Sequence, residues 1–409
     1  MTNYFYEKEK FISFKKVEEL WNKNFRDTVV YLNNPFCKKN NCSYCCHKGY
    51  ANSEDKEVQD FYFKYMPQQF DKYKNIIEKQ NIKLVSFGGG TPNYLSAKDF
   101  DKYLNLLPSK LKETKKIIEL HPAYLTKEFI DVLKKHNFDT LIFCIQTFDD
   151  KTLINQKRAV PNKPNLFHCF RYAKKLGFNI AVDLITYWTK KEEDYNILKK
   201  DLYLLKWLEP HEISISVLYQ NKYYNENFNS LEVYKKIYTL TNNILTEYIP
   251  ENIDLKDMYQ CAPSRFFKKD FDRSIFDVYK NSLSCVPWEH EQGYSTLGIG
   301  SYKCELSDVY SVIGPNYVIY ETNNQDYYLA KNYSFWDAIR KEVDRLEKLI
   351  GENEVPVGTG IVFTNVVENL GEFYKGFIQG SCKTNIIERQ GVKSKLEEKL
   401  TSNFFKLIN

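Results

Sequence analysis

The sequence predicts an α/β fold, a partial (β/α)6 barrel followed by a C-terminal α+β extension. Short β-branched runs alternate with longer, charged amphipathic stretches at least six times, as in repeated βα units around a parallel sheet. A polar or glycine residue stands where each run ends, as expected if the carboxyl ends of parallel strands meet at one rim. Six right-handed βα units would close most of a barrel.

The six expected strands are short apolar runs. They lie at 28–32, 83–87, 116–120, 140–145, 179–184 and 212–217. In chain order they lead into a cysteine loop, a glycine turn, Glu119, Gln146, Asp183 and the pair Tyr219-Gln220. A strand end is where polarity normally resumes, so the prediction of a functional rim depends on all six together.

Four amphipathic stretches between the runs are expected helices, at 97–107, 126–136, 164–177 and 192–208. Gly177 ends the third of them, and the pair His136-Asn137 ends the second, both of which are typical helix stops. Further amphipathic stretches lie at 230–248, 335–351 and 393–408. We expect the last two to cap the mouth of the barrel.

The chain of 409 residues is long enough for two or three domains. We expect an N-terminal extension at 1–24, the barrel at 25–227 and a C-terminal substrate or capping domain at 228–409.

Composition and charge exclude several classes of function. The net charge of +5 is spread over 58 basic and 53 acidic residues without a basic block, so neither nucleic acid nor an anionic membrane is an expected partner. No run of about 18 apolar residues exists, so no membrane span is expected. Ten cysteines in a chain whose start, MTNYFYEKEK, lacks an apolar signal core indicate a reducing, cytoplasmic setting.

A cysteine loop follows the first expected strand in the run YLNNPFCKKNNCSYCC. Cys37, Cys42 and Cys45 could hold three irons of a four-iron cluster and leave the fourth iron open for a ligand. A zinc site is the competing interpretation, because Cys46 or His47 could complete a tetrahedral set of ligands. The loop by itself leaves both open.

The motif SFGGGTP, at 86–92 after the second expected strand, favours the iron–sulfur interpretation. Together the cysteine loop and the glycine turn resemble the radical S-adenosylmethionine (SAM) superfamily, in which the same two features follow the first two barrel strands. The resemblance implies a [4Fe-4S] cluster on Cys37, Cys42 and Cys45, with SAM as the second cofactor.

The resemblance narrows to the branch typified by oxygen-independent coproporphyrinogen III oxidases, over 31–219 and more weakly over 288–304. It is carried by Tyr31 with PFC, by GGGTP, by ELHP, by CIQTFDDKTLINQKR, by VDL and by ISISVL. The family's SAM-contacting positions correspond here to Tyr31, Gly88, Gly89, Gly90, Thr91, Glu119, Gln146, Arg158 and Asp183. Glycines let backbone groups approach a ligand, and carboxylates accept hydrogen bonds from ribose hydroxyls or ammonium groups. Arginine can donate two parallel hydrogen bonds to a carboxylate.

The departures from the family pattern concern the loop and the substrate side. The loop reads C-x4-C-x2-C where the family has C-x3-C-x2-C, Asn33 replaces a common His, and the Gly-Leu-Pro turn after Asp183 is missing. A register through Cys42 and Cys46 restores the x3 step but finds Gly49 where the third cysteine should be. We therefore keep Cys37, Cys42 and Cys45, and leave the family's substrate open.

The resemblance implies an enzyme, a radical SAM oxidoreductase or transferase. Its 5′-deoxyadenosyl radical would take hydrogen from a small organic substrate, possibly a tetrapyrrole, and an electron donor such as flavodoxin or ferredoxin would serve it. Eight arginines are few for a tetrapyrrole with four propionates. The alternatives are a radical methylase or cyclising enzyme and a non-enzymatic heme carrier.

The remaining C-terminal cysteines do not indicate an auxiliary cluster. They are too widely spaced, at Cys261, Cys285, Cys304 and Cys382.

Overall fold

A computed structural model describes residues 6–23, 27–37, 42–45, 50–51, 55–189, 191–218, 230–250, 264–271, 294–302, 310–313, 317–321 and 327–332. Both expected segment boundaries, at 24/25 and 227/228, fall outside these residues. The same holds for the expected helices at 335–351 and 393–408, for the strand end at Tyr219-Gln220, and for Cys46, Cys261, Cys285, Cys304 and Cys382. These stay predictions.

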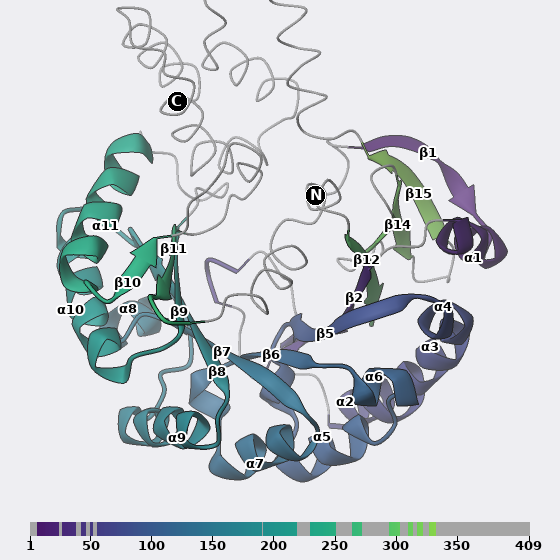
Figure 1. The fold of residues 1–409 in the computed structure, drawn as a ribbon, viewed down its shortest axis with the longest axis horizontal. Helices are drawn as coiled ribbons and strands as arrows, with labels where there is room; N and C mark the ends of the chain where they lie inside the picture. Colours follow the sequence, from purple (N-terminus) through teal and green to yellow (C-terminus); the bar gives the residue numbers. More distant parts are fainter. Residues whose placement is uncertain are drawn as a thin grey trace, which may run out of the picture.

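Six neighbouring parallel strands form the centre of the fold, and they confirm the predicted strands. In sheet order they are β2 (Asp27–Asn34), β5 (Asn81–Gly89), β6 (Lys116–Leu120), β7 (Phe138–Gln146), β8 (Asn179–Thr186) and β9 (Glu212–Val217). Their order in space follows their order in sequence, and Figure 1 shows them as a curved sheet with helices along its outer side. All six carboxyl ends therefore lie at the same edge.

The predicted crossover helices are present, and side chains cap three of them. They are α5 (Ala97–Leu104), α7 (Lys127–Lys135), α9 (Lys163–Lys175) and α10 (Glu193–Leu208). Ser96, Thr126 and Asn162 accept hydrogen bonds from the third backbone amide beyond them, which satisfies one of the free donors at each helix start. Gly177, with φ of 78°, follows α9 as predicted from its helix-stop position.

Further helices complete the outer layer. They are α1 (Phe14–Lys23), α2 (Asp55–Asp60), a π-helical turn (Phe61–Tyr65), α3 (Met66–Lys72), α4 (Lys74–Lys79), α6 (Ser109–Glu113) and α8 (Asp150–Asn155). The predicted helix at 230–248 is shorter than expected: α11 (Ser230–Ile244) ends before β10 (Tyr248–Pro250). None of the described helices is both long and apolar enough to cross a bilayer.

The same sheet continues beyond the barrel strands on both sides. β12 (Tyr294–Ile299) lies parallel beside β2. Antiparallel strands follow it in the order β13 (Tyr310–Ile313), β14 (Tyr317–Glu321), β15 (Tyr327–Asn332) and β1 (Tyr6–Ile12), and β11 (Ser264–Lys268) joins β9 to β10 at the other edge. The described strands of the C-terminal half and of the N-terminus thus extend the barrel sheet, which has 13 strands in all.

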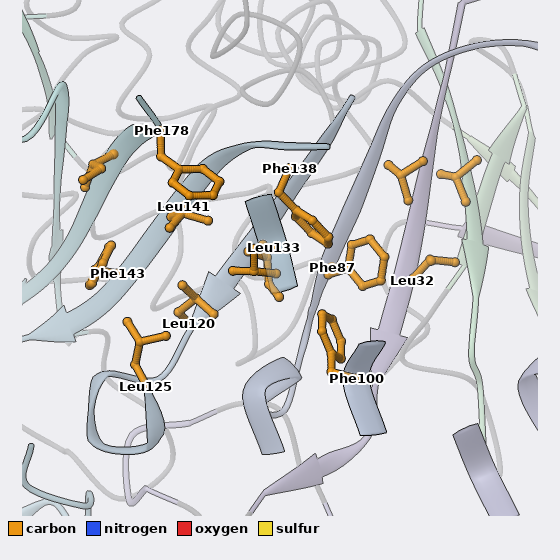
Figure 2. Packing of buried hydrophobic residues seen from close by; sticks show 14 of the residues in the cluster. Leu32, Phe87, Phe100, Leu120, Leu125, Leu133, Phe138, Leu141, Phe143 and Phe178 are labelled. Atoms are coloured by element: carbon orange, nitrogen blue, oxygen red, sulfur yellow. The ribbon is translucent and has the colours of Figure 1, made fainter. Parts of the chain in front are cut away.

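Two apolar layers hold the sheet, one on each face. The outer layer packs strand residues against the helices: Phe138 lies 5.1 Å from Phe87, ring centre to ring centre, and Phe100 of α5 stacks on Phe129 of α7 at 4.8 Å. Figure 2 shows this layer, with Leu133 of α7 pointing towards the strands. The inner cluster is smaller and consists of Val29, Leu84, Ile117, Ile142, Ala181 and Phe267.

Candidate functional site

Four side chains rise from the inner cluster towards the carboxyl ends of the strands. Tyr31, Glu119, Cys144 and Asp183 each lie two residues beyond a member of the inner cluster on the same strand. Since side chains two apart on a strand share a face, all four point to the inner side of the sheet. The strand register thereby gathers three of the predicted site residues, together with Cys144.

The two carboxyl groups in this group are linked electrostatically. Burial raises the pKa of Glu119 to about 8, and the negative charge of Asp183 adds to the shift. Burial also raises the pKa of Asp183 to about 6, against the opposing effects of Arg265, Cys144 and Arg158. The Cys144 thiol lies 3.7 Å from an Asp183 oxygen. Near neutral pH the site therefore carries an ionised Asp183 beside a largely protonated Glu119.

The glycine turn packs against the end of β2 and has no room for side chains. A Cβ on Gly88 would lie 2.6 Å from the Tyr31 hydroxyl, and one on Gly90 would lie 2.5 Å from the Phe36 carbonyl oxygen. Gly89 has φ of 98°, and its Cβ would lie 2.1 Å from the Asn33 side chain. The predicted close backbone approach is present, but its partner in these contacts is the strand leading to the cysteine loop.

Hydrogen bonds from that turn reach the cysteine loop itself. The Thr91 amide donates to the Phe36 carbonyl at 2.8 Å, and the Thr91 hydroxyl lies 3.7 Å from the Cys37 sulfur. Burial raises the pKa of the Cys37 thiol above its ordinary value, and the hydrogen bond from Thr91 offsets part of this increase. Cys37 belongs to β3 (Phe36–Cys37), which pairs with β4 (Tyr50–Ala51). The two predicted motifs are therefore in direct contact.

The described second part of the loop, residues 42–45, holds the other two predicted cysteines. Cys42 is half-buried and Cys45 is exposed. No disulfide joins the described cysteines, and no three of the described His, Cys, Asp and Glu side chains are grouped to hold a metal ion. The Tyr44 ring packs edge-on against the Trp188 ring, with 5.3 Å between the ring centres.

Arg158 joins this loop to the strand that carries Cys144. Its guanidinium donates to the Tyr44 hydroxyl at 3.0 Å, lies 3.7 Å from the Cys42 sulfur, and donates to the Cys144 carbonyl. The sequence suggested a role for Arg158 towards SAM. In the structure its donors also fix the cysteine loop next to β7, a contact that spacing alone could not reveal because the partners are 114 residues apart.

Gln146 ends β7 in an unusual conformation. Its φ is 68°, in the left-handed region that few non-glycine residues adopt, and the pairing of β7 with β8 shifts between Phe143 and Gln146. The next residues are held by the buried Asp201 of α10, which accepts from the Phe148 amide at 2.9 Å and the Thr147 hydroxyl at 2.8 Å. Asp201 was not identified from the sequence, where it looks like one more charge on an amphipathic helix.

The histidines have structural contacts. His121 accepts from the Ala123 amide at 3.2 Å through Nδ1 and caps a short turn. Burial lowers its pKa well below the ordinary histidine value, so it stays neutral. His136 lies 2.5 Å from Asp101, and His168 stacks on Tyr172 on an outer helix. Both contacts are structural.

Both the sequence and the fold are similar to those of known proteins. Residues 34–200 match the family model of the Radical SAM superfamily. The heme chaperone HemW of Bacillus subtilis is 27% identical over 172 residues, which are 38% of this chain and 41% of that protein. The oxygen-independent coproporphyrinogen III oxidase of Synechocystis is 28% identical over 169 residues, 40% of this chain and 36% of that protein. The matched region thus spans less than half the length of these relatives.

The fold has a more extensive counterpart. The structure of coproporphyrinogen III oxidase HemN from Escherichia coli matches with a TM-score of 0.63 and 16% identity, covering 98% of this chain and 94% of that one. At this identity the likeness concerns the fold alone. Taken together, residues 34–200 are similar to the Radical SAM superfamily, and the chain resembles its oxygen-independent coproporphyrinogen III oxidase-like branch.

Proposed function

We propose that this chain is a radical SAM enzyme whose site is the rim between the cysteine loop and the ends of β5 to β8. Proteins of the superfamily use a [4Fe-4S] cluster and SAM. One observation carries the proposal: Arg158 contacts Cys42 and Tyr44 in the loop and also donates to the backbone carbonyl of Cys144 on β7. The thiol of Cys144 in turn contacts Asp183. A cluster on the loop would therefore stand beside the carboxyl groups of Asp183 and Glu119.

The donors around the loop suit thiolate ligands. Iron–sulfur clusters are held by cysteine thiolates, and hydrogen bonds to sulfur tune them. The Thr91 hydroxyl at Cys37 and the Arg158 guanidinium at Cys42 supply one such donor each, both at 3.7 Å. We assign Cys37, Cys42 and Cys45 as the three protein ligands. When bound, the cluster supplies the electron that cleaves SAM to methionine and a 5′-deoxyadenosyl radical.

The inner wall suits a cationic, hydroxyl-rich ligand such as SAM. Asp183 can accept from ribose hydroxyls or from the ammonium group, and an ammonium group near Glu119 would favour its ionised form by lowering its pKa. Tyr31, Gly88, Gly89, Gly90, Thr91, Gln146 and Arg158 complete the assigned wall. The chain's own task is to orient this ligand and to exclude water around the reacting carbon.

A tetrapyrrole is the first substrate class to test, because the relatives include coproporphyrinogen oxidases. The arginine content argues against a site for four propionates. Arg171 lies over the ring of the exposed Trp207, 4.3 Å away on the outer helices, and Arg265 is buried 3.6 Å from Glu212. Of the described arginines, Arg158 alone therefore reaches the loop. We propose a small organic molecule as the substrate, with a tetrapyrrole as the class to test first.

Heme carriage is the second candidate, favoured by the similarity to the heme chaperone of Bacillus subtilis. A carrier would bind heme stoichiometrically and cleave SAM slowly or not at all. For either function we expect a reducing, cytoplasmic setting, and for the enzyme an electron donor such as flavodoxin or ferredoxin.

A single anaerobic assay separates these functions. Reconstituted protein is chemically reduced and then incubated with SAM, either alone or together with coproporphyrinogen III, and the products are followed by mass spectrometry. Heme binding is titrated in parallel. A tetrapyrrole oxidase releases 5′-deoxyadenosine faster with coproporphyrinogen and liberates carbon dioxide; a methylase also forms S-adenosylhomocysteine. Stoichiometric heme binding without SAM cleavage above the protein-free control would contradict the enzyme and support the carrier.

A further inference from the structure

The described part of the cysteine loop is docked onto the end of α8 through one pair of residues. The Ser43 amide donates to the Gln156 carbonyl at 3.0 Å, and the Ser43 hydroxyl donates to the Gln156 side-chain oxygen. Gln156 is only 9% exposed, so its side chain is held in place by its surroundings. Ser43 lies directly after Cys42, and the contact therefore restrains the position of that thiol.

The helix that offers Gln156 is itself anchored at its start. Asp149 caps α8 by accepting from the Thr152 amide at 2.8 Å, and the Asp149 amide donates to the Thr147 hydroxyl at 3.0 Å. Thr147 in turn donates to Asp201, which is 2% exposed on α10. An unbroken chain of hydrogen bonds and helix backbone thus runs from α10 to Gln156.

The far end of α8 is fixed as well. Lys157 adopts φ of 56°, which reverses the chain, and the Arg158 amide donates to the Leu153 carbonyl at 2.9 Å. This turn directs the Arg158 side chain to Tyr44 and Cys42. The segment from Gln146 to Arg158 therefore meets the loop at two points, at Ser43 through Gln156 and at the Cys42 thiol through Arg158.

We propose that Gln156 is a positioning residue for the cysteine loop, acting through the Ser43 hydroxyl. Because Gln146 and Arg158 lie at the two ends of the same segment, α8 sets the position of Cys42 relative to the wall assigned to SAM. This inference rests on the proposed function for its meaning, but the docking itself is a property of the loop and can be measured without any cofactor.

The first test uses the cofactor-free protein. Ser43→Thr keeps the hydroxyl and Ser43→Val replaces it by a methyl group of the same shape, so the pair isolates one hydrogen bond. Alkylation of Cys42 by iodoacetamide, followed by peptide mass spectrometry, should be about fivefold faster in Ser43→Val than in Ser43→Thr, the factor that losing one hydrogen bond of this kind gives. Equal rates would overturn the proposal.

The second test approaches the same bond from α8. Gln156→Met removes the acceptor and Gln156→Glu keeps one, and Ile154→Ala, at a side chain 63% exposed on the same helix, serves as the matched control. After anaerobic reconstitution, iron loss to a chelator should be about fivefold faster in Gln156→Met than in Ile154→Ala, and the electron paramagnetic resonance spectrum of the reduced cluster should change. Combining Ser43→Val with Gln156→Met should add little.

The two tests fail in different ways. If wild-type protein takes up no iron, the proposed function is wrong, while the alkylation rates still decide whether Gln156 docks the loop. If wild-type protein assembles a cluster and Gln156→Met retains both the iron and the spectrum of Ile154→Ala, the positioning role is wrong and the proposed function stands. Far-ultraviolet circular dichroism identifies a variant that fails to fold, in which case the Ser43 pair decides.

Discussion

The side-chain amide of Asn33 donates a hydrogen bond to the Gly300 carbonyl at 3.3 Å, joining residues 267 positions apart. Asn33 lies next to the last residue of β2, just before the cysteine loop, and Gly300 follows β12, so the C-terminal half of the chain supports the base of that loop. Gly300 has φ of 108°, and a Cβ there would lie 2.5 Å from the Asn33 carbonyl oxygen. A network continues outward, because Ser301 donates to the buried Glu321 at 2.8 Å and Lys72 pairs with Glu321 at 3.0 Å.

This contact predicts that Gly300→Ala is destabilising. The new Cβ would meet backbone, which cannot swing away, in a conformation that already disfavours side chains. We expect the free energy of unfolding to fall by about 2 to 4 kcal/mol, measured by urea denaturation. Gly177→Ala is the control, since Gly177 has φ of 78° but nothing within 4 Å of its Cβ position, and should cost about 1 kcal/mol. Equal losses would show that the Asn33 contact is not tight.

Gly89→Ala should weaken SAM binding more than Gly88→Ala. At Gly89 the Cβ would meet the Asn33 side chain and, at 2.6 Å, the Asn34 carbonyl, so the end of β2 must move. At Gly88 the nearest atom is the end of the Tyr31 side chain, which can rotate. We expect at least about a tenfold loss of affinity for Gly89→Ala by equilibrium dialysis, from a strain of roughly 1.5 kcal/mol or more. A larger loss for Gly88→Ala would contradict this.

SAM affinity should depend on pH through Asp183. Its pKa is raised to about 6, so the carboxylate that would accept from SAM is ionised above that value and is lost as the pH falls through it. Asp183→Asn should weaken binding at neutral pH by about 1.5 to 3 kcal/mol and remove the pH dependence near 6. The exposed Asp131→Asn should leave both unchanged. A wild-type profile that is flat across this range would count against the assignment.

Glu119→Gln should alter the pH dependence of stability. The folded-state pKa of Glu119 is raised to about 8, so the folded protein favours the protonated group, and this contribution is present below the unfolded value and lost as the pH rises through about 8. Gln cannot ionise. Between roughly pH 5 and pH 9 the free energy of unfolding of the cofactor-free variant should therefore rise relative to that of the wild type by about 1 to 3 kcal/mol, allowing for partial solvation. A constant difference in urea denaturation would show that Glu119 is not buried as described.

The six barrel strands could be predicted because their signal is local. Runs such as KIIEL and FDTLIFCIQ are buried on both faces of the sheet over most of their length, so their centres, II and LIF, are apolar. β1 and β12 to β15 were not predicted as strands of this sheet. YEKEKFI is highly charged, and the pairing of Tyr6 with Asn332 depends on a chain closure of more than 300 residues that no window contains.

The site was predictable to the extent that its residues follow strands or form motifs. Glu119 and Asp183 lie on the inner face because strand periodicity places them there. The docking of Ser43 on Gln156 joins residues 113 positions apart and involves two ordinary polar side chains, so no sequence signal marks it. The glycine turn was expected to make room for a ligand, whereas its Cβ positions are blocked by β2. Close approach of a ligand and close packing against β2 both require glycine, so the sequence does not distinguish the two.

On the proposed function, Cys37, Cys42 and Cys45 hold a cluster that cleaves SAM at the adjacent wall. The most direct test is to quantify 5′-deoxyadenosine from anaerobically reconstituted, chemically reduced protein with SAM, against a variant with all three cysteines changed to alanine. The wild type should carry about four irons per chain and release the nucleoside, and the variant should do neither. Four-iron wild-type protein that releases no more 5′-deoxyadenosine than the triple variant, or a chain that takes up zinc and no iron, would contradict the account.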